Sequence, residues 1–312
     1  MIVVDRDAIA RAATPALVFA TVRATLTAHA HGRTSVPPPL HLEFPDAGGD
    51  CHVKAGWVTG ADDFAVKIAT GFYGNPGRGL PTNHGLVAVV SARTGAVRAV
   101  LDDGGLLTAW RTAAAGALVT HALARPDATT LGVFGTGEQA RLQVEWLTRL
   151  RPLREVLVHG RDPRKAEALC AVLGPVARPA SAAETTAADL VVTTTPSTTP
   201  VLDATLIRPG THVTGIGADM PHKNELPAVL FARAETIATD DHAQCLHHGD
   251  FGHAVRAGTV PDHADTPIGL LLDGTLTRSE SAITVADLTG VGALDAALAS
   301  AVLDAVLTGG HP

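Results

Sequence analysis

The pattern of apolar and polar positions divides the chain into stretches with different periods. Residues 7–29 have helical spacing, and the segments after them are typical of short strands separated by turns. Residues 85–103 hold two apolar strands joined by Arg93-Thr94-Gly95, which predicts a hairpin. The Ala-rich run TAWRTAAAGALVTHALA then predicts one long helix that ends near Pro126. The first third is therefore expected to be α+β, with an antiparallel sheet.

From Thr129 onward, apolar runs alternate with helical stretches. The runs are TTLGVFG, EVLVHG, DLVVTTT, HVTGIG and TIAT, and helices are expected at 138–149 and 163–174. This alternation indicates an α/β fold with a doubly wound parallel sheet of the Rossmann type. The small apolar residues after Ile283 predict a closing helix that packs back on the first domain. We therefore expect a Rossmann domain at 116–287, inserted into an α+β domain formed by 1–115 plus 288–312.

Composition narrows the class of protein. The chain has 312 residues, 46% hydrophobic and 18% charged, and no apolar run reaches the ~18 residues of a membrane span. A formal charge of -7 without a Lys/Arg run argues against nucleic-acid and membrane partners and favours small molecules. Cys51, Cys170 and Cys245 match neither a disulfide framework nor a zinc knuckle, and the N-terminus lacks a signal pattern. A soluble, cytoplasmic protein is expected.

A glycine-rich turn follows the run LGVF and opens a helix. Its sequence is Gly135-Thr136-Gly137-Glu138-Gln139-Ala140. In this context the first glycine permits a tight turn, the second lets the backbone approach a pyrophosphate, and Ala140 lets helix and strand pack closely. The turn therefore predicts a dinucleotide site, with Glu138, Gln139 and Thr194, near the end of DLVVTTT, as further cofactor contacts. The alternative is an ordinary connection between a strand and a helix.

The residues after VLVHG bear on which nucleotide is bound. A dinucleotide with a free ribose 2′-hydroxyl favours an acid at this place, but His159 is followed by Gly160 and Arg161. Because an arginine attracts a 2′-phosphate, we predict NADP(H) over NAD(H), with Arg161 carrying the preference. The alternative is that Arg161 is solvated and Asp162 binds the ribose of NAD(H).

Several segments carry a resemblance in their order and spacing. They are AVKIATGFYGNPGRGLPTNHG, LDDGGLLTAWRTAAAGAL, GTGEQA, GIGADMPHKNELP, DDHAQCLHHGDF and DLTGVGALDAALA. Between residues 32 and 307 the chain resembles the ornithine cyclodeaminase/mu-crystallin family, which includes alanine dehydrogenases and cyclic ketimine reductases. The resemblance implies a Rossmann domain inserted into a substrate-binding domain that pairs across a homodimer.

The resemblance also implies roles for particular residues. Lys67 and Arg111 would hold the substrate carboxylate, and Thr82 would line the same pocket. Asp219 would handle the proton of the substrate amine, and Thr112 would contact the cofactor phosphates. Hydride transfer at an amino-acid Cα needs such an oriented carboxylate and a proton-transfer group. Taken singly, Lys67 is also typical of a half-exposed strand, Arg111 of an exposed helix position and Asp219 of a turn.

One departure from the family concerns the substrate. Pro39 stands where the family has an arginine that binds the carboxylate, and His41 or His52 could take its place. The sequence leaves open a ketimine reductase, an amino-acid dehydrogenase or an ornithine cyclodeaminase proper. A non-catalytic NADPH-binding protein of the mu-crystallin kind is the alternative, although such a binder has no need of Asp219.

The histidine-rich stretch 242–253 invites a metal hypothesis. His242, Cys245, His248 and Asp250 have spacings that a helical metal site could use, but they match none of the usual zinc patterns. We therefore expect no metal and regard these histidines as solvated or satisfied in the core.

Overall fold

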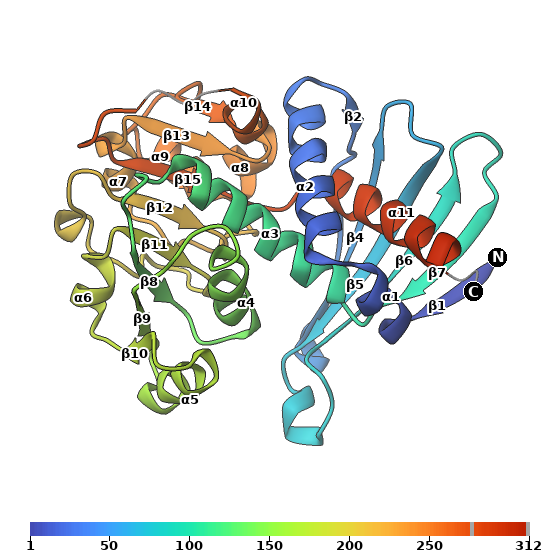
Figure 1. Ribbon diagram of the computed structural model, residues 1–312, viewed down its shortest axis with the longest axis horizontal. Helices are drawn as coiled ribbons and strands as arrows, with labels where there is room; N and C mark the ends of the chain where they lie inside the picture. Colours follow the sequence, from blue (N-terminus) through green and yellow to red (C-terminus); the bar gives the residue numbers. More distant parts are fainter. Residues whose placement is uncertain (275–277, 310–312) are drawn as a thin grey trace. The chain divides into compact units, whose positions relative to one another are not determined.

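The computed structural model describes residues 1–274 and 278–309. The chain divides into two compact units, Met1–Arg111 with Val291–Pro312, and Thr112–Gly290 (Figure 1). It leaves the first unit within helix α3 (Leu106–Leu123) and returns just before helix α11 (Gly292–Gly309). The second unit is therefore an insertion into the first, and both boundaries lie a few residues from those expected.

The single helix expected at 7–29 is wrong, because the structure has two. Helix α1 spans Arg6–Ala12 and helix α2 spans Pro15–Ala30. The Thr14 hydroxyl accepts the N–H of Leu17 at 3.3 Å and caps α2. Pro15 lacks an N–H and disfavours the helical conformation at the residue before it, so the chain must break here. The apolar pattern runs across the break without interruption.

The first unit holds a mixed sheet. In chain order its strands are β1 (Ile2–Asp5), β2 (Thr34–Ser35), β3 (Leu40–Phe44), β4 (Gly49–Val58), β5 (Asp63–Phe72), β6 (Asn83–Ser91) and β7 (Val97–Asp102), with short 3-10 turns at Pro45–Ala47 and Asn75–Arg78. The spatial order is β1-β7-β6-β5-β4-β2, and β3 also pairs with β4. The hairpin of β6 and β7 is as expected, and Gly95 in its turn has φ +74. Pairing is antiparallel except between β1 and β7.

Helix α11 covers one face of this sheet. It packs on β4, β5 and α2 (Figure 1), and a Cβ at Gly56 would lie 2.6 Å from the Gly292 carbonyl oxygen. By length and composition the helix could cross a membrane, although Asp295 and Asp304 interrupt its apolar run, and half of its 18-residue window is buried. Core helices pass the same test, so this finding carries no argument for a membrane.

The second unit is built on a parallel sheet. Its described strands are β8 (Thr130–Phe134), β9 (Glu155–His159), β10 (Ala177–Pro179), β11 (Leu190–Thr193), β12 (His212–Gly215), β13 (Thr236–Thr239), β14 (Asp265–Pro267) and β15 (Thr284–Asp287). The order is β10-β9-β8-β11-β12-β15-β13-β14, and every described pair is parallel. Its other helices are α4 (Glu138–Leu147), α5 (Pro163–Leu173), α6 (Ala182–Thr186), α7 (Ala228–Arg233), α8 (His242–His248), α9 (Asp250–Arg256) and α10 (Ile268–Asp273). This is the Rossmann-type domain expected from the alternating pattern.

The segment after Ile283 corrects one expectation. The closing helix does not begin there, because Thr284–Asp287 forms strand β15 between β12 and β13. All four residues of this strand are buried. A strand buried on both faces has no alternation of apolar and polar residues, so its sequence could pass as the start of the helix.

Candidate active site

Two buried cations of the first unit share one buried carboxylate. The Lys67 Nζ donates to Oδ2 of Asp295 at 2.8 Å, and the Arg111 Nε donates to Oδ1 at 3.1 Å. The three residues are 4%, 5% and 3% exposed. The two residues that the family resemblance assigns to the substrate carboxylate therefore lie together in the structure.

Elements far apart in the sequence place these side chains. Lys67 lies in β5, directly across from Lys54 in β4, and Arg111 lies in the first half of α3. The buried Asp103 carboxylate accepts the N–H groups of Gly105 at 3.1 Å and Leu107 at 2.8 Å. This cap fixes the start of the helix that carries Arg111.

Burial and mutual attraction set the charges in this cluster. Burial lowers the pKa of Lys67, Arg111 and Lys54 add to this decrease, and the pairing with Asp295 opposes it, so that the pKa is about 8. Burial alone would raise the pKa of Asp295, but Arg111 and Lys67 outweigh it and bring that pKa to about 2. At neutral pH Asp295 is ionised and Lys67 is mostly protonated.

Asp295 is a residue that sequence reasoning missed. It stands in GALDAALA, among small apolar residues of α11. The available signal was an acid among small apolar residues of a helix, because a buried carboxylate needs a partner. Its partners are far away in the sequence and could not be named from the pattern.

Two other predicted substrate residues of the first unit do not join this cluster. The Thr82 carbonyl accepts the N–H of Phe72 at 2.8 Å, at the end of β5, roughly 16 Å along the strand from Lys67. His41 lies in β3 opposite His52, and strand β4 separates it from β5. The substrate roles of Thr82 and His41 stay predictions.

The glycine turn of the second unit has the geometry of a nucleotide site. Gly135 has φ +124, and a Cβ there would lie 2.4 Å from the Thr194 Oγ1. The Thr194 hydroxyl donates to the Phe134 carbonyl at 3.2 Å, so β11 and the turn are held together. A Cβ at Gly137, the N-cap of α4, would meet open space within the described residues. Because Gly137 has no side chain, a pyrophosphate could approach the free N–H groups at the start of α4.

Other predicted cofactor residues surround this turn. Thr136, between the two glycines of the turn, lies close to Gly160 after β9, where a Cβ would be 2.6 Å from its Cγ2. Glu138 and Gln139 open α4, and the Gln143 Nε2 of the same helix donates to the Thr112 carbonyl at 3.3 Å and to the Gln139 Oε1 at 3.4 Å. The structure therefore brings Thr112, the turn and Thr194 into one region of the second unit.

The turn after β9 bears on the choice of nucleotide. Arg161 is exposed. The next residue, Asp162, caps α5: its carboxylate accepts the N–H of Arg164 at 3.1 Å and pairs with the Arg164 guanidinium at 3.3 Å. The Asp162 carboxylate therefore already has partners at the start of α5.

Asp219 lies in the loop after β12, where its exposed carboxylate accepts a hydrogen bond from the Lys223 Nζ at 2.6 Å. Its role in proton transfer stays a prediction.

The loop that carries Asp219 is held by Glu225, a residue that sequence reasoning missed. The Glu225 carboxylate accepts the Thr193 hydroxyl at 2.9 Å, the Thr195 hydroxyl at 2.7 Å and the Gly217 N–H at 2.6 Å. Burial raises the pKa of Glu225, and these bonds oppose the rise. The residue ties the loops after β11 and β12 together, and its only sequence signal was its place in GIGADMPHKNELP.

The histidines of 242–253 have protein partners. His242 pairs with Asp265 at 2.8 Å, His248 with the Asp219 carbonyl at 3.2 Å, and His253 with the Lys223 carbonyl at 2.9 Å. These contacts give His242, His248 and His253 partners within the protein.

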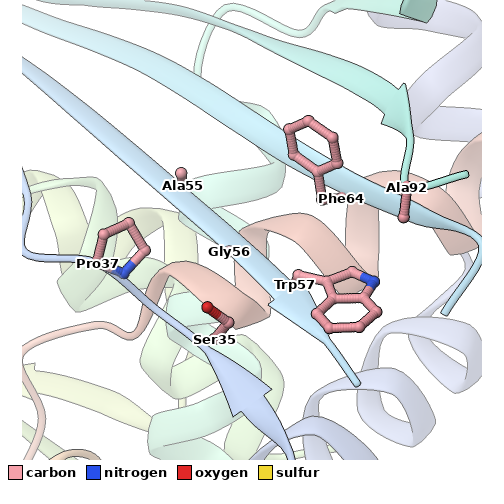
Figure 2. A pocket seen from close by; sticks show the side chains of 7 residues that line it. All are labelled: Ser35, Pro37, Ala55, Gly56, Trp57, Phe64 and Ala92. Atoms are coloured by element: carbon pink, nitrogen blue, oxygen red, sulfur yellow. The ribbon is translucent and has the colours of Figure 1, made fainter. Parts of the chain in front are cut away.

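A shallow hollow of about 320 Å³ lies elsewhere on the first unit (Figure 2). It is lined by Ser35, Pro37, Ala55, Gly56, Trp57, Phe64 and Ala92. Ala55 alternates along β4 with Lys54, so its side chain points to the opposite face of the sheet from the cluster around Lys67. The hollow is not part of the cation site.

Comparison with known proteins identifies the family to which the chain is similar. A profile of the ornithine cyclodeaminase/mu-crystallin family matches residues 4–310. One relative, from Rhizobium meliloti (strain 1021), is named as a dehydrogenase. It is 44% identical over 276 residues, which cover 85% of this chain and 83% of the relative. The iminosuccinate reductase of Paracoccus denitrificans (strain Pd 1222) is 30% identical over 309 residues, 97% of this chain and 96% of the relative. An archaeal alanine dehydrogenase dimer with bound NAD superposes with a TM-score of 0.90 at 30% identity, covering 99% of this chain and 97% of that one.

The expected fold and the expected enzyme class, an NAD(P)-dependent oxidoreductase or cyclodeaminase-type enzyme, are confirmed by these matches. The chain belongs to the ornithine cyclodeaminase/mu-crystallin family.

Proposed function

We propose that the protein transfers a hydride between a nicotinamide nucleotide and the Cα of a small amino or cyclic imino acid. The observation that carries the proposal is the buried pair of cations, Lys67 and Arg111, fixed on the two oxygens of Asp295. Buried cations held in one geometry suit a planar anion such as a carboxylate. The names of the relatives, a dehydrogenase and an iminosuccinate reductase, support the same class of reaction.

Each residue has a defined task in this proposal. Lys67 has further N–H donors beyond the one given to Asp295, and the Arg111 guanidinium bonds Asp295 through Nε, which leaves its Nη groups for the substrate carboxylate. The nicotinamide nucleotide, when bound, supplies or accepts the hydride. Asp219 takes the proton of the substrate amine as the imine forms, or returns one on reduction. With a pKa of about 8, Lys67 can also exchange a proton near neutral pH.

A nicotinamide-absorbance screen tests the function. NADPH or NADH is offered with cyclic imino acids or with pyruvate plus ammonia, and the oxidised nucleotides with ornithine, proline and alanine. Net oxidation or reduction of the nucleotide identifies a reductase or dehydrogenase, whereas ammonia release from ornithine without net change identifies a cyclodeaminase. Lys67→Ala and Arg111→Ala are expected to lose at least ~100-fold in kcat/KM, and Arg11→Ala, an exposed residue of α1, is the matched control. A fully active Lys67→Ala enzyme would remove the site assignment.

We also propose that NADP(H) is preferred over NAD(H). Arg161 is exposed in the turn after β9. The alternative ribose partner, Asp162, already forms a hydrogen bond and an ion pair with Arg164. The NAD bound to the archaeal alanine dehydrogenase makes NAD(H) the competing choice. Arg161→Ala should raise the Kd of NADPH about tenfold and leave that of NADH nearly unchanged. Equal effects on both nucleotides would reject the preference.

We propose that the protein is a homodimer joined through the uncovered face of the first unit's sheet. Val3, Leu40, Leu42 and Ile68 share this face by register and are 69%, 52%, 49% and 39% exposed. Large exposed apolar patches of this kind mark interaction surfaces. Light scattering should give the dimer mass, and the double variant Leu42→Asp/Ile68→Asp should give a folded monomer. Val172→Asp, which is also exposed but lies in α5, is the control.

A cytoplasmic location completes the proposal. Cys51, Cys170 and Cys245 are all buried free thiols, which suits a reducing compartment. Cell fractionation with antibody detection tests the location, and recovery of the protein outside the cytoplasm would reject it.

A further inference from the structure

The hairpin of β3 and β4 carries a group of metal-ligand side chains on one face. His41 in β3 lies directly across from His52 in β4, and Glu43 lies directly across from Asp50. Because side chains two apart in a strand share a face, all four lie on the same side of the hairpin. Leu42 and Cys51, the pair between them, point to the other side.

The distances within this group are those of a nearly assembled site. One ligand atom from each of His41, Asp50 and His52 lies within 4.8 Å of the other two. The His52 Nε2 is 3.7 Å from the Asp50 Oδ1, and the His41 Nδ1 is 3.9 Å from the Glu43 Oε1. Ligand atoms around a tetrahedral zinc ion are roughly 3.3 Å apart, so small side-chain rotations would complete the coordination.

A neighbouring tyrosine orients one member of the group. The Tyr73 hydroxyl donates to the Asp50 Oδ2 at 3.2 Å, which leaves Oδ1 on the side of His52. Partners of this kind orient the ligands of a metal site. The side chains of His41, His52 and Asp50 are 27%, 25% and 22% exposed, so the group is sheltered but open to an entering ion.

We propose that His41, Asp50 and His52 bind a divalent transition-metal ion of the zinc class, with Glu43 as the fourth ligand. Imidazole and carboxylate donors suit Zn²⁺ and Co²⁺, whereas Mg²⁺ and Ca²⁺ require oxygen ligands alone. This site differs from the sequence expectation of no metal, which rested on the stretch 242–253. It also gives His41 a role distinct from substrate binding. The next register pair along β4 on this face is Lys54–Lys67, so the ion would add positive charge on the sheet face that carries the carboxylate anchor.

Metal binding is measured on the full chain without a polyhistidine tag, after removal of metals with a chelator. Dialysis against Zn²⁺ followed by mass spectrometry should recover one ion per chain. Calorimetric titration should give a Kd that rises more than about tenfold in the variants His41→Ala and His52→Ala. Co²⁺ should give the visible absorption bands of a tetrahedral site. His84→Ala, an exposed histidine on the opposite face of the same sheet, should bind as the parent does.

Two outcomes would overturn the site: recovery of no stoichiometric Zn²⁺, or an unchanged Kd in the double variant His41→Ala/His52→Ala. Asp50→Asn guards against a folding artefact, because it keeps the shape of the side chain while it removes the charge. Circular dichroism confirms that each variant is folded. None of these measurements depends on enzyme turnover, so the site can fail or stand separately from the proposed function.

Discussion

At the scale of single residues, the Asp295 carboxylate pairs with two buried cations, Lys67 and Arg111. A buried lysine by itself would lose its proton more easily, and the ion pair with Asp295 limits this loss. Removing one partner of a buried ion pair is costly, because it leaves the other charges buried without compensation. Asp295 therefore holds the geometry of the Lys67–Arg111 pair and favours the protonated form of Lys67.

Asp295→Asn should destabilise the fold and shift its pH response. We expect the free energy of unfolding to fall by about 3–5 kcal/mol, as for other broken buried ion pairs. The pKa of Lys67 should drop below about 8, because Asp295 no longer raises it, and the alkaline limb of kcat/KM should move to lower pH. Urea unfolding and a pH–rate profile measure the two effects.

Asp304→Asn is the matched control, since Asp304 lies on the same helix with a side chain that is 65% exposed. Its effect on stability should stay within about 0.5 kcal/mol. An Asp295→Asn protein as stable as the parent, with the same alkaline limb, would contradict the role given to the carboxylate.

The cation cluster shows what a sequence can say about single residues. Lys67 and Arg111 were predictable because each stands inside a segment that resembles the family. Asp295 was not, because its function depends on packing of α11 on β5, a contact between positions far apart in the chain. A motif identifies the residues of a site more readily than the residue that holds them.

At the scale of elements, the turn before α4 contains two glycines that are needed for different reasons, one for the backbone conformation and one for space. Gly135 has φ +124 and lies against Thr194, so Gly135→Ala strains the backbone and clashes. Gly137 has φ -87 and open space around its missing Cβ among the described residues. An alanine there is compatible with the fold but would stand in the path of a pyrophosphate.

The two variants should therefore differ in a diagnostic way. Gly135→Ala is expected to lower stability by about 1–3 kcal/mol and to weaken nucleotide binding. Gly137→Ala should keep its melting temperature and still weaken nucleotide binding about tenfold or more. Thermal unfolding and NADPH fluorescence titration distinguish them, and a Gly137→Ala protein with unchanged affinity would place the nucleotide elsewhere.

Elements also differ in how well their sequence predicts them. The hairpin of β6 and β7 and the helix α3 were predictable, because a local turn signal or a long apolar period defines each one. The break before Pro15 was visible in the sequence but was masked by an apolar pattern that continues across it. Strand β15 was not predictable from periodicity, because both of its faces are buried in the parallel sheet.

At the scale of the whole molecule, two buried carboxylates of the second unit link stability to pH. Burial raises the pKa of Asp287 to about 8, although the N–H of Phe251, which Asp287 accepts at 2.8 Å, opposes the rise. Burial raises the pKa of Asp250 well above its usual value, with the charges of Asp287 and Glu225 adding to the rise. Asp250 Oδ2 and Asp287 Oδ1 each lack a hydrogen-bond partner within residues 1–274 and 278–309. Neutral carboxyl groups are thus favoured in the folded state.

The sign of the pH effect follows from these shifts. A carboxyl group with a raised pKa is protonated more fully in the folded chain than in the unfolded chain, whose aspartate pKa is about 3.9. Its contribution to stability is complete below pH ~4 and is lost progressively as the pH rises from there to about 8. Asp287→Asn replaces the protonated carboxyl group with a neutral amide, so the variant should escape this loss. Its stability relative to the parent should rise between pH 5 and pH 8, with a slope of at most ~1.4 kcal/mol per pH unit.

Denaturant unfolding at several pH values measures the difference in stability between Asp287→Asn and the parent. The control Asp273→Asn, at an exposed position in α10, should show no such change with pH. A difference between Asp287→Asn and the parent that stays constant with pH would mean that Asp287 is ionised in the folded protein.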